Sequence, residues 1–375
     1  MATSLRGLRR LNISLANSAF FKYNFINVGV RSMYTERDLG VSLYENTRYV
    51  FRNQFMTIEN VFREKMQEIC QHENGVIYTE DLKAMIHLAQ PNENDMQLLN
   101  VMLEKYVQNQ EEKKFGKYIF GPVVMRMYYY LNQPEYALGV FKNDAMKDSF
   151  NYRTSFRILM CLLYKNDMYK EMREMYQKVF DAEGIEYIGS SVVLIYAACL
   201  KENTPEAVEF ALGHWKYQQN TMKPSVRSSA LLSYLLIKNN KPDMAMEILS
   251  AIPLERVMSI RNLKMLAYIH LEKYIQIIPI LKYGTDRDIN RNKQYYFFSE
   301  VIDELEEKLK TEEVEESKQL SSLIELARLH DYIQSNCTLE EFILKPMTLS
   351  RKRKESSGEQ RRYYPDKRSE SKSYL

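Results

Sequence analysis

Apolar residues recur three and four positions apart along most of the chain, which is the spacing of one face of an α-helix. Between about residues 130 and 250 this pattern repeats as a unit: an apolar helix, a short polar break, and a second helix that opens with an acidic residue. Equivalent positions in the second helices, Ala137, Met172, Ala207 and Ala245, lie 35, 35 and 38 residues apart. A helix pair of this length cannot bury its apolar stripe alone, so neighbouring pairs must stack.

The apolar positions agree from unit to unit. The second helices carry apolar residues at i, i+3, i+4 and i+7, as in Met172, Met175, Tyr176 and Val179. Three of these helices have a proline near their start, where a helix loses no backbone hydrogen bond. We therefore predict an all-α fold in which helix-turn-helix repeats over residues 115–285 stack into an α-solenoid. An irregular helical domain is the alternative, and the recurring period disfavours it.

Helical segments are also predicted before the repeats. In the N-terminal helical region, residues 36–110, apolar residues step by three or four from Phe55 to Ile69 and indicate one long helix. The Asn74-Gly75 pair ends this helix. Thr79 is expected to cap the next one.

The segment after the repeats is predicted to be a C-terminal helical cap, residues 286–349. Residues 259–283 form a fifth, degenerate helix pair before it, and a polar linker follows at 286–292. An acidic amphipathic helix over 297–309 and another over 320–333 come next. These helices would cover the open end of the solenoid.

A short final helix and a polar tail complete the chain. Thr338 and Glu341 have the spacing of a capping box, which predicts a helix start at this point. Residues 350–375 are rich in Ser, Lys, Arg and Glu, which is typical of a disordered basic tail.

The first 35 residues have the chemistry of a targeting segment. Residues 1–35 contain five basic residues and no acidic one, and four leucines between Leu5 and Leu15 lie three or four positions apart. A basic amphipathic helix of this kind is typical of mitochondrial transit peptides, whereas a secretory signal needs a continuous apolar core. We therefore predict a mitochondrial transit peptide over residues 1–35, with processing between Arg31 and Thr35.

Charge is distributed unevenly along the chain. The net charge is +3, but residues 1–35 and 350–375 each carry +5, which leaves −7 for residues 36–349. Proteins that act by neutralising phosphates usually have a basic folded body, so this balance argues against nucleic-acid binding. Residues 111–180 carry +4, and residues 300–318 carry −6. Any polyanion site is therefore expected in the first repeats.

No constellation of residues indicates catalysis. The five histidines are isolated, and the four cysteines, Cys70, Cys161, Cys199 and Cys337, are far apart. No phosphate loop, dinucleotide-binding glycine motif or metalloprotease motif occurs. The longest apolar run, nine residues from Val192, is far shorter than the roughly 20 needed to cross a bilayer. We therefore expect no enzyme activity, catalytic residue, cofactor, metal site, small-molecule substrate or transmembrane segment.

The unit that begins at Ser155 identifies the type of repeat. Its opening, Ser-Phe-Arg-Ile-Leu-Met at 155–160, and its second helix, Tyr-Lys-Glu-Met-Arg-Glu-Met-Tyr at 169–176, resemble the pentatricopeptide pattern. That pattern opens with Thr-Tyr-Asn-x-Leu-Ile and has Glu-Ala-x-x-Leu-Phe in the second helix. The Met-Lys-Pro-Ser-Val sequence at 222–226 is similar to the family's Ile-Lys-Pro-Asp-Val ending. The tetratricopeptide signature, with its Trp and Leu-Gly, is absent from these openings.

The resemblance to the pentatricopeptide repeat family runs from about residue 36 to residue 350. It implies a right-handed α-solenoid in the mitochondrial matrix. It also implies an RNA-binding factor for mRNA processing or stability that supports respiratory-chain biogenesis. Mitochondrial RNA would then be the main partner, with a possible protein partner in RNA processing.

The positions that read bases in this family are mostly unsuited to that role here. In the best-understood members, a polar residue on each first helix and another at the end of the unit read one base. The corresponding first-helix positions are Pro122, Arg157, Val192 and Ala230, of which only Arg157 can donate a hydrogen bond to a base or phosphate. Base-by-base reading is therefore not expected.

Four residues of the more basic first units are the candidate RNA contacts. Arg126 and Arg153 suit phosphate, Arg157 suits base or phosphate, and Tyr164 suits stacking. Each could instead be a solvated charge or a packed ring. The alternative function is a mitochondrial protein–protein scaffold without sequence-specific RNA contact, which the negative body charge favours.

Overall fold

The computed structural model describes residues 33–112, 118–221, 224–252, 257–285, 297–311 and 316–346. Nearly all of the predicted transit peptide, the linker at 286–292 and the tail at 350–375 lie outside these residues.

The described residues are almost entirely helical. The N-terminal helices are α1 (Glu36–Leu39), α2 (Val41–Phe55), α3 (Glu59–Gln71), α4 (Thr79–Leu88) and α5 (Glu93–Glu112). What we call the first helices of the repeats are α6 (Gly121–Leu131), α9 (Arg153–Lys165), α12 (Val192–Glu202), α14 (Val226–Lys238) and α16 (Met258–His270). The second helices are α7 (Pro134–Lys142), α10 (Tyr169–Glu183), α13 (Pro205–Thr221), α15 (Pro242–Ser250) and α17 (Ile277–Thr285).

Shorter elements connect the repeats and follow them. Within the repeats these are η1 (Asp144–Met146), α8 (Lys147–Phe150), α11 (Ile185–Ile188), η2 (Gly189–Ser191) and η3 (Tyr274–Gln276). The C-terminal elements are β1 (Phe297–Phe298), α18 (Ser299–Thr311), α19 (Ser317–Leu329), β2 (Ile333–Gln334) and α20 (Leu339–Leu344).

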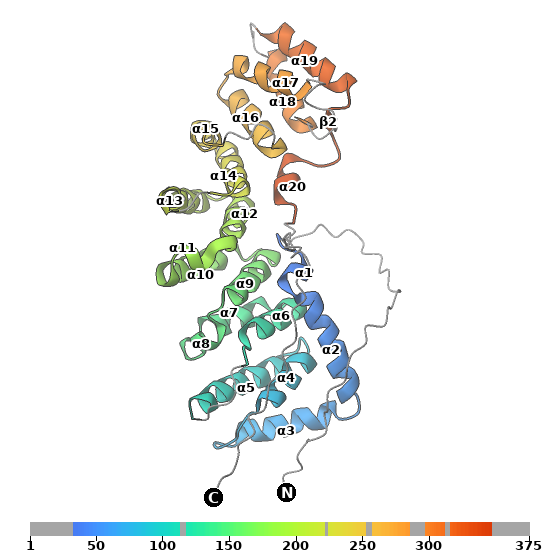
Figure 1. Ribbon diagram of the computed structural model, residues 1–375, viewed down its shortest axis with the longest axis vertical. Coiled ribbons are helices and arrows are strands. Elements are labelled where there is room, and N and C mark those ends of the chain that lie inside the picture. The colour runs from blue at the N-terminus through green and yellow to red at the C-terminus, as the bar shows by residue number, and fades with distance from the viewer. Residues whose placement is uncertain are drawn as a thin grey trace, which may run out of the picture. The chain divides into compact units, whose positions relative to one another are not determined.

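The helix pairs stack in chain order, which confirms the predicted all-α helical-repeat fold. Each first helix packs on the next, from α6 to α9, α12, α14, α16 and then α18. Figure 1 shows second helices α10, α13 and α15 on one side of this row, and α1, α2 and α20 on the other. The right-handed winding of the stack stays a prediction.

Burial of the first helices forms the core. In α12 all nine residues from Val192 to Leu200 are buried, because α9, α10, α13 and α14 all pack against this helix. The small anchors Ala137, Ala207 and Ala245 are fully buried, as expected where two helices approach closely. Second helices α7, α13 and α15 begin at proline, as predicted.

Asparagines at the ends of the first helices link neighbouring repeats. Asn132 and Asn166 each donate a side-chain hydrogen bond to the other at 3.0 Å. The side chain of Asn239 donates one hydrogen bond to the side-chain oxygen of Asn203 at 2.8 Å. Asn132 and Asn203 also adopt the left-handed conformation, with φ of 54° and 49°, which asparagine tolerates better than most residues. The ends of adjacent first helices therefore meet in a regular way.

Three local expectations were wrong. The predicted long helix breaks at residues 56–58, because α2 packs on α4 and α6 whereas α3 packs on α4 and α5, which needs a change of direction. The residue that caps α4 is Tyr78 rather than Thr79, and the Asp81 carboxylate accepts from the Tyr78 amide. The predicted helix over 320–333 ends at Leu329, and a two-residue parallel pairing of β1 with β2 follows it.

A buried polar network joins three helices in the middle of the stack. The Tyr176 hydroxyl on α10 lies 2.7 Å from His214 Nε2, and the Tyr196 hydroxyl on α12 lies 3.0 Å from Nδ1. The Tyr196 hydroxyl donates to Gln218 Oε1, so it accepts from Nδ1–H while Nε2 accepts from Tyr176. Burial lowers the pKa of His214 to about 4. The imidazole is therefore neutral at physiological pH.

We predict that this network makes stability depend on pH. Because the pKa of His214 is lower in the folded state than in the unfolded state, its contribution to the free energy of unfolding is fully present above pH 6.5. It falls as the pH drops toward 4, by up to about 3 kcal/mol. The free energy of unfolding, measured with urea between pH 7.5 and pH 4, should fall less steeply with decreasing pH for His214→Gln than for the exposed control His72→Gln. Equal pH slopes for the two variants would contradict this assignment.

Candidate nucleic-acid interface

The candidate interface is the side of the first helices that faces away from the second helices, which we call the first-helix face. The chain's own segments lie across parts of it: α2 packs on α6, α1 on α9, and α20 on α14 and α16. The placement of the predicted site residues depends on these segments.

Arg126 on α6 is tied to the N-terminal segment. Its Nε donates to the backbone oxygen of Leu39 at 2.8 Å. Burial lowers the pKa of Arg126, with Tyr118 acting in the opposite direction. Gly40, with φ of 75°, lies against the guanidinium, and a Cβ there would come within 2.8 Å of Nε. The contact therefore uses both the charge of Arg126 and the absence of a side chain at position 40.

The two other predicted arginines occupy different environments. Arg153 is exposed, and its guanidinium lies 6.0 Å from the centre of the Tyr187 ring. Arg157 is half-buried and lies 5.7 Å from the centre of the Tyr34 ring, while its Nε has no hydrogen-bond partner within the described part of the chain. Both guanidinium groups thus lie beside aromatic rings, and their positive charge can also attract an external anion.

Tyr164 is mostly enclosed. Its side chain is 5% exposed and packs edge-to-face on Tyr169, and burial raises the pKa of its hydroxyl. A ring in this position has little surface for stacking with a base. The tyrosines at 128 and 129 are buried as well, whereas Tyr130 is 40% exposed.

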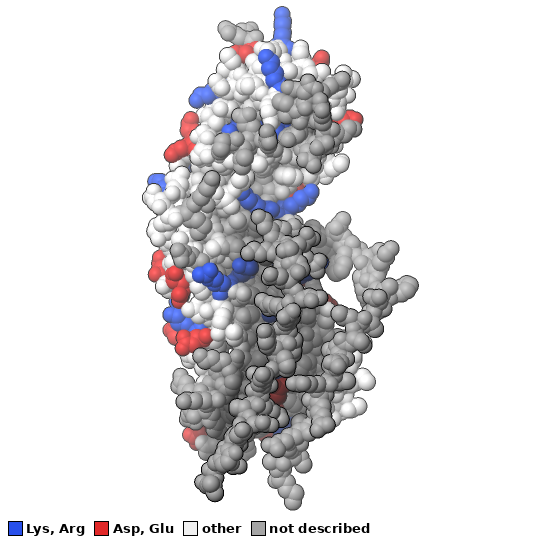
Figure 2. Space-filling model, in the orientation of Figure 1, with Lys and Arg blue, Asp and Glu red and all other residues white. Residues whose placement is uncertain are grey.

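The structure also reveals a row of basic residues that the sequence interpretation missed. Each first helix from α9 to α16 carries a basic residue in its last turn: Lys165, Lys201, Lys238 and His270. Because neighbouring first helices run side by side, these residues follow one another along one edge of the first-helix face. We call Lys165, Lys201 and Lys238 the lysine row. On the face shown in Figure 2, lysine and arginine side chains are exposed at the level of α14 and α20 in Figure 1.

A carboxylate of α20 binds two members of the lysine row. Lys201 Nζ lies 2.9 Å from Glu340 Oε1, and Lys238 Nζ lies 2.6 Å from Glu340 Oε2. Burial acts to raise the pKa of Glu340, but the two lysines outweigh it, so the pKa lies below its usual range. Nearby, Arg227 Nη2 donates to the backbone oxygens of Ile343 and Lys345. Ammonium groups from adjacent repeats thus converge on a single anion.

A sequence signal for the lysine row did exist. Lys165-Asn166, Lys201-Glu202-Asn203 and Lys238-Asn239 each place a lysine just before the asparagine that ends a first helix, at intervals of 36 and 37 residues. Glu340 had no such signal, because it lies 139 residues from Lys201.

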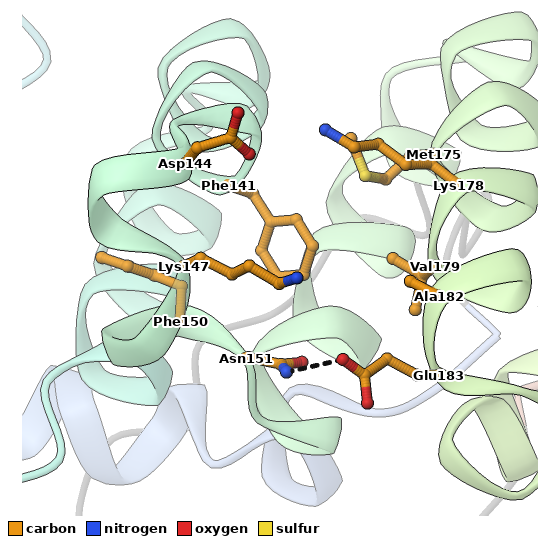
Figure 3. A pocket seen from close by; sticks show the side chains of 10 residues that line it. All are labelled: Phe141, Asp144, Lys147, Phe150, Asn151, Met175, Lys178, Val179, Ala182 and Glu183. Atoms are coloured by element: carbon orange, nitrogen blue, oxygen red, sulfur yellow. Dashed lines mark hydrogen bonds between the residues drawn. The ribbon is translucent and has the colours of Figure 1, made fainter.

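A cleft on the opposite side of the stack has different chemistry. It lies between α7, α8 and α10, has a volume of about 80 Å³, and contains the ring of Phe141 with Met175 and Val179 (Figure 3). Two acids and two lysines also line it, Asp144, Glu183, Lys147 and Lys178. This balance gives the cleft no preference for a polyanion.

Metal-binding clusters and membrane-spanning helices are both absent from the described residues. No three His, Cys, Asp or Glu side chains come together as metal ligands in the part of the chain that the structure describes. Within the same residues, every helix is too short or too polar to span a bilayer.

Known proteins resemble the chain at low identity. It is 27% identical to pentatricopeptide repeat-containing protein 2, mitochondrial, of Pongo abelii over 257 residues, which are 68% of this chain and 66% of that protein. The Mus musculus protein of the same name is 26% identical over 258 residues, and that of Danio rerio is 30% identical over 139. The match thus spans slightly less than two thirds of the first of these relatives. No protein-family model matches the chain, and no solved structure does.

These relatives confirm the resemblance drawn from the sequence motifs. In the sequence, residues 115–126, 154–160, 298–301 and 338–340 are the stretches in which we see the resemblance to pentatricopeptide repeat-containing protein 2. The chain resembles pentatricopeptide repeat-containing protein 2 of several vertebrates.

We predict that Arg126 holds the N-terminal segment on the first-helix face. Arg126→Met removes the donor to Leu39 and should lower the free energy of unfolding by about 1–3 kcal/mol. Hydrogen exchange of the α1 and α2 amides should accelerate, while that of α12 stays unchanged. Arg52→Met, at an exposed position on α2, is the control. Equal exchange in the two variants would show that Arg126 does not anchor the segment.

Proposed function

We propose that this protein is a mitochondrial RNA-binding helical-repeat protein that holds single-stranded RNA along its first-helix face. The names of the mitochondrial pentatricopeptide repeat-containing relatives support the compartment and the type of repeat, and the resemblance to that repeat family implies RNA as the ligand. The finer proposal is that it acts in the matrix in mRNA processing or stability and thereby supports respiratory-chain biogenesis. In this role it is not an enzyme, and any processing chemistry belongs to a protein partner.

The observation that carries the proposal is the convergence of Lys201 and Lys238 on one carboxylate. Two ammonium groups that bind one anion between neighbouring repeats are equally suited to a phosphate. The row continues to Lys165 on α9, whose ammonium now lies 4.9 Å from the centre of the Tyr129 ring. RNA bound in this way would follow the stack of repeats through its backbone.

Recognition of bases would be limited. The first-helix positions Val192 and Ala230 are buried apolar residues with 3% and 1% exposure, so they offer no hydrogen bond. Arg153 and Arg157 remain candidates for phosphate or base contacts near the start of α9. Affinity should therefore depend mainly on phosphate contacts and on salt.

The first test is the salt dependence of binding to a fluorescent single-stranded 20-nucleotide RNA. Changing Lys165, Lys201 and Lys238 together to Gln should weaken binding. The logarithm of the association constant should also fall less steeply with the logarithm of the salt concentration, by about 0.7 in slope for each phosphate that the protein no longer neutralises. A matched control changes the exposed lysines of the second helices, Lys142, Lys170 and Lys216, to Gln. The proposal fails if both triple variants bind alike, or if the unaltered protein binds no RNA.

The predicted arginines are tested separately. Arg153→Ala with Arg157→Ala should lower RNA affinity by roughly tenfold, because two charged groups no longer bind the RNA. These two changes leave the bond between Arg126 and Leu39 in place, so the N-terminal segment should stay docked. Unchanged affinity would remove Arg153 and Arg157 from the site while leaving the lysine row as the phosphate contact.

The second candidate function is a protein–protein scaffold in mitochondria. Residues 36–349 carry a net charge of −7, and α1, α2 and α20 already cover parts of the first-helix face. Crosslinking of RNA to the protein in intact mitochondria separates the two functions. A sharp peak on one transcript supports RNA binding, whereas background RNA with a stable co-purifying protein supports the scaffold.

A further inference from the structure

Helix α20 is a small element on the first-helix face. It has six residues, of which Leu339 and Ile343 are buried, and it packs on α14 and α16. Hydrogen bonds and a ring contact also anchor it: the Leu339 amide donates to Glu300 Oε1 at 2.6 Å, Arg227 donates to the backbone oxygens of Ile343 and Lys345, and the Phe342 ring packs on Phe298. Apolar burial therefore holds one side of the helix, and Glu340 supplies its ionic contacts.

Its acidic residue lies where the proposed RNA backbone would pass. Glu340 is 23% exposed and binds Lys201 and Lys238, which are 40% and 36% exposed. After burial, the negative charge of Glu340 also raises the pKa of the hydroxyls of Tyr164 on α9 and Tyr234 on α14. A carboxylate is chemically similar to one phosphate of RNA as a partner for ammonium groups.

The contacts of α20 suit a reversible attachment. Ion pairs with this much exposure are weak and are screened by salt, so an incoming polyanion can replace them at small cost. The capping box is internal to the segment: the Thr338 amide donates to Glu341 and the Glu341 amide donates to Thr338. Detachment of α20 therefore leaves its own N-terminal hydrogen bonds intact.

We propose that α20 is an acidic clasp in which Glu340 occupies a phosphate position between Lys201 and Lys238, and that RNA binds by displacing it. This inference rests on the proposed RNA-binding function and adds its regulation. The clasp lowers the affinity for RNA that offers few phosphates to the lysine row. Longer single strands, which engage several repeats at once, overcome it.

The test compares Glu340→Gln with the control Glu325→Gln, which removes an exposed acid from α19. Each full-length variant is titrated with the fluorescent single-stranded 20-nucleotide RNA at low salt. Loss of the competing charge should tighten binding of Glu340→Gln about fivefold, since two weak ion pairs no longer have to be broken. The control should bind like the unaltered protein. A melting curve confirms that both variants fold.

A second measurement follows the clasp directly by hydrogen exchange. Addition of RNA to the unaltered protein should accelerate exchange of the α20 amides, while α12 and α14 stay protected. Without RNA, the α20 amides of Glu340→Gln should exchange faster than those of the unaltered protein. If RNA binds but neither affinity nor α20 exchange responds to Glu340→Gln, the clasp is overturned and the RNA-binding proposal stands. If neither protein binds RNA, the proposed function fails and the clasp fails with it.

Discussion

Burial of the first helices on nearly every side is the constraint on which the other features depend. In α12, the consecutive residues from Val192 to Leu200 are all buried because neighbours pack against this helix from both directions of the stack. A helix in such a position cannot present polar side chains along its length without burying them at a cost. In α12, the charged residues Lys201 and Glu202 therefore lie at the C-terminal end of the helix, where it reaches solvent.

The lysine row is consistent with this arrangement on two grounds. A cation in the last turn of a helix interacts favourably with the negative end of the helix dipole, so Lys165, Lys201 and Lys238 have a structural role without any ligand. The same positions repeat at the period of the stack, so a cation recurs at the end of each of these three helices. A protein whose body is acidic overall can thus keep one strip of surface that attracts anions.

The sequence predicted the local parts of this structure well and the distant contacts poorly. The helix pairs could be predicted because each repeat has the same apolar period. Prolines such as Pro205 mark where the second helices begin. The break between α2 and α3 was missed because apolar spacing continues through residues 56–58, although Ile58 is exposed. Tyr164 was a candidate for base stacking, with a packed ring as the alternative, because spacing alone does not show that Tyr169 of α10 packs against it. The bonds of Arg126 to Leu39 and of Glu340 to Lys201 join residues 87 and 139 positions apart, and no local pattern encodes them.

The return of α20 to α12 and α14 has a consequence for how the molecule comes apart. In a simple stack each repeat touches only its neighbours, so the end repeats can peel away one at a time. Here the packing of α20 on α14 and α16, together with the ion pair between Lys201 and Glu340, closes a loop that contains α14 to α19. Mechanical pulling on the C-terminal end would first load a few side chains at the middle of the stack. Only after these contacts break would the helices from α14 to α19 be free to separate from one another.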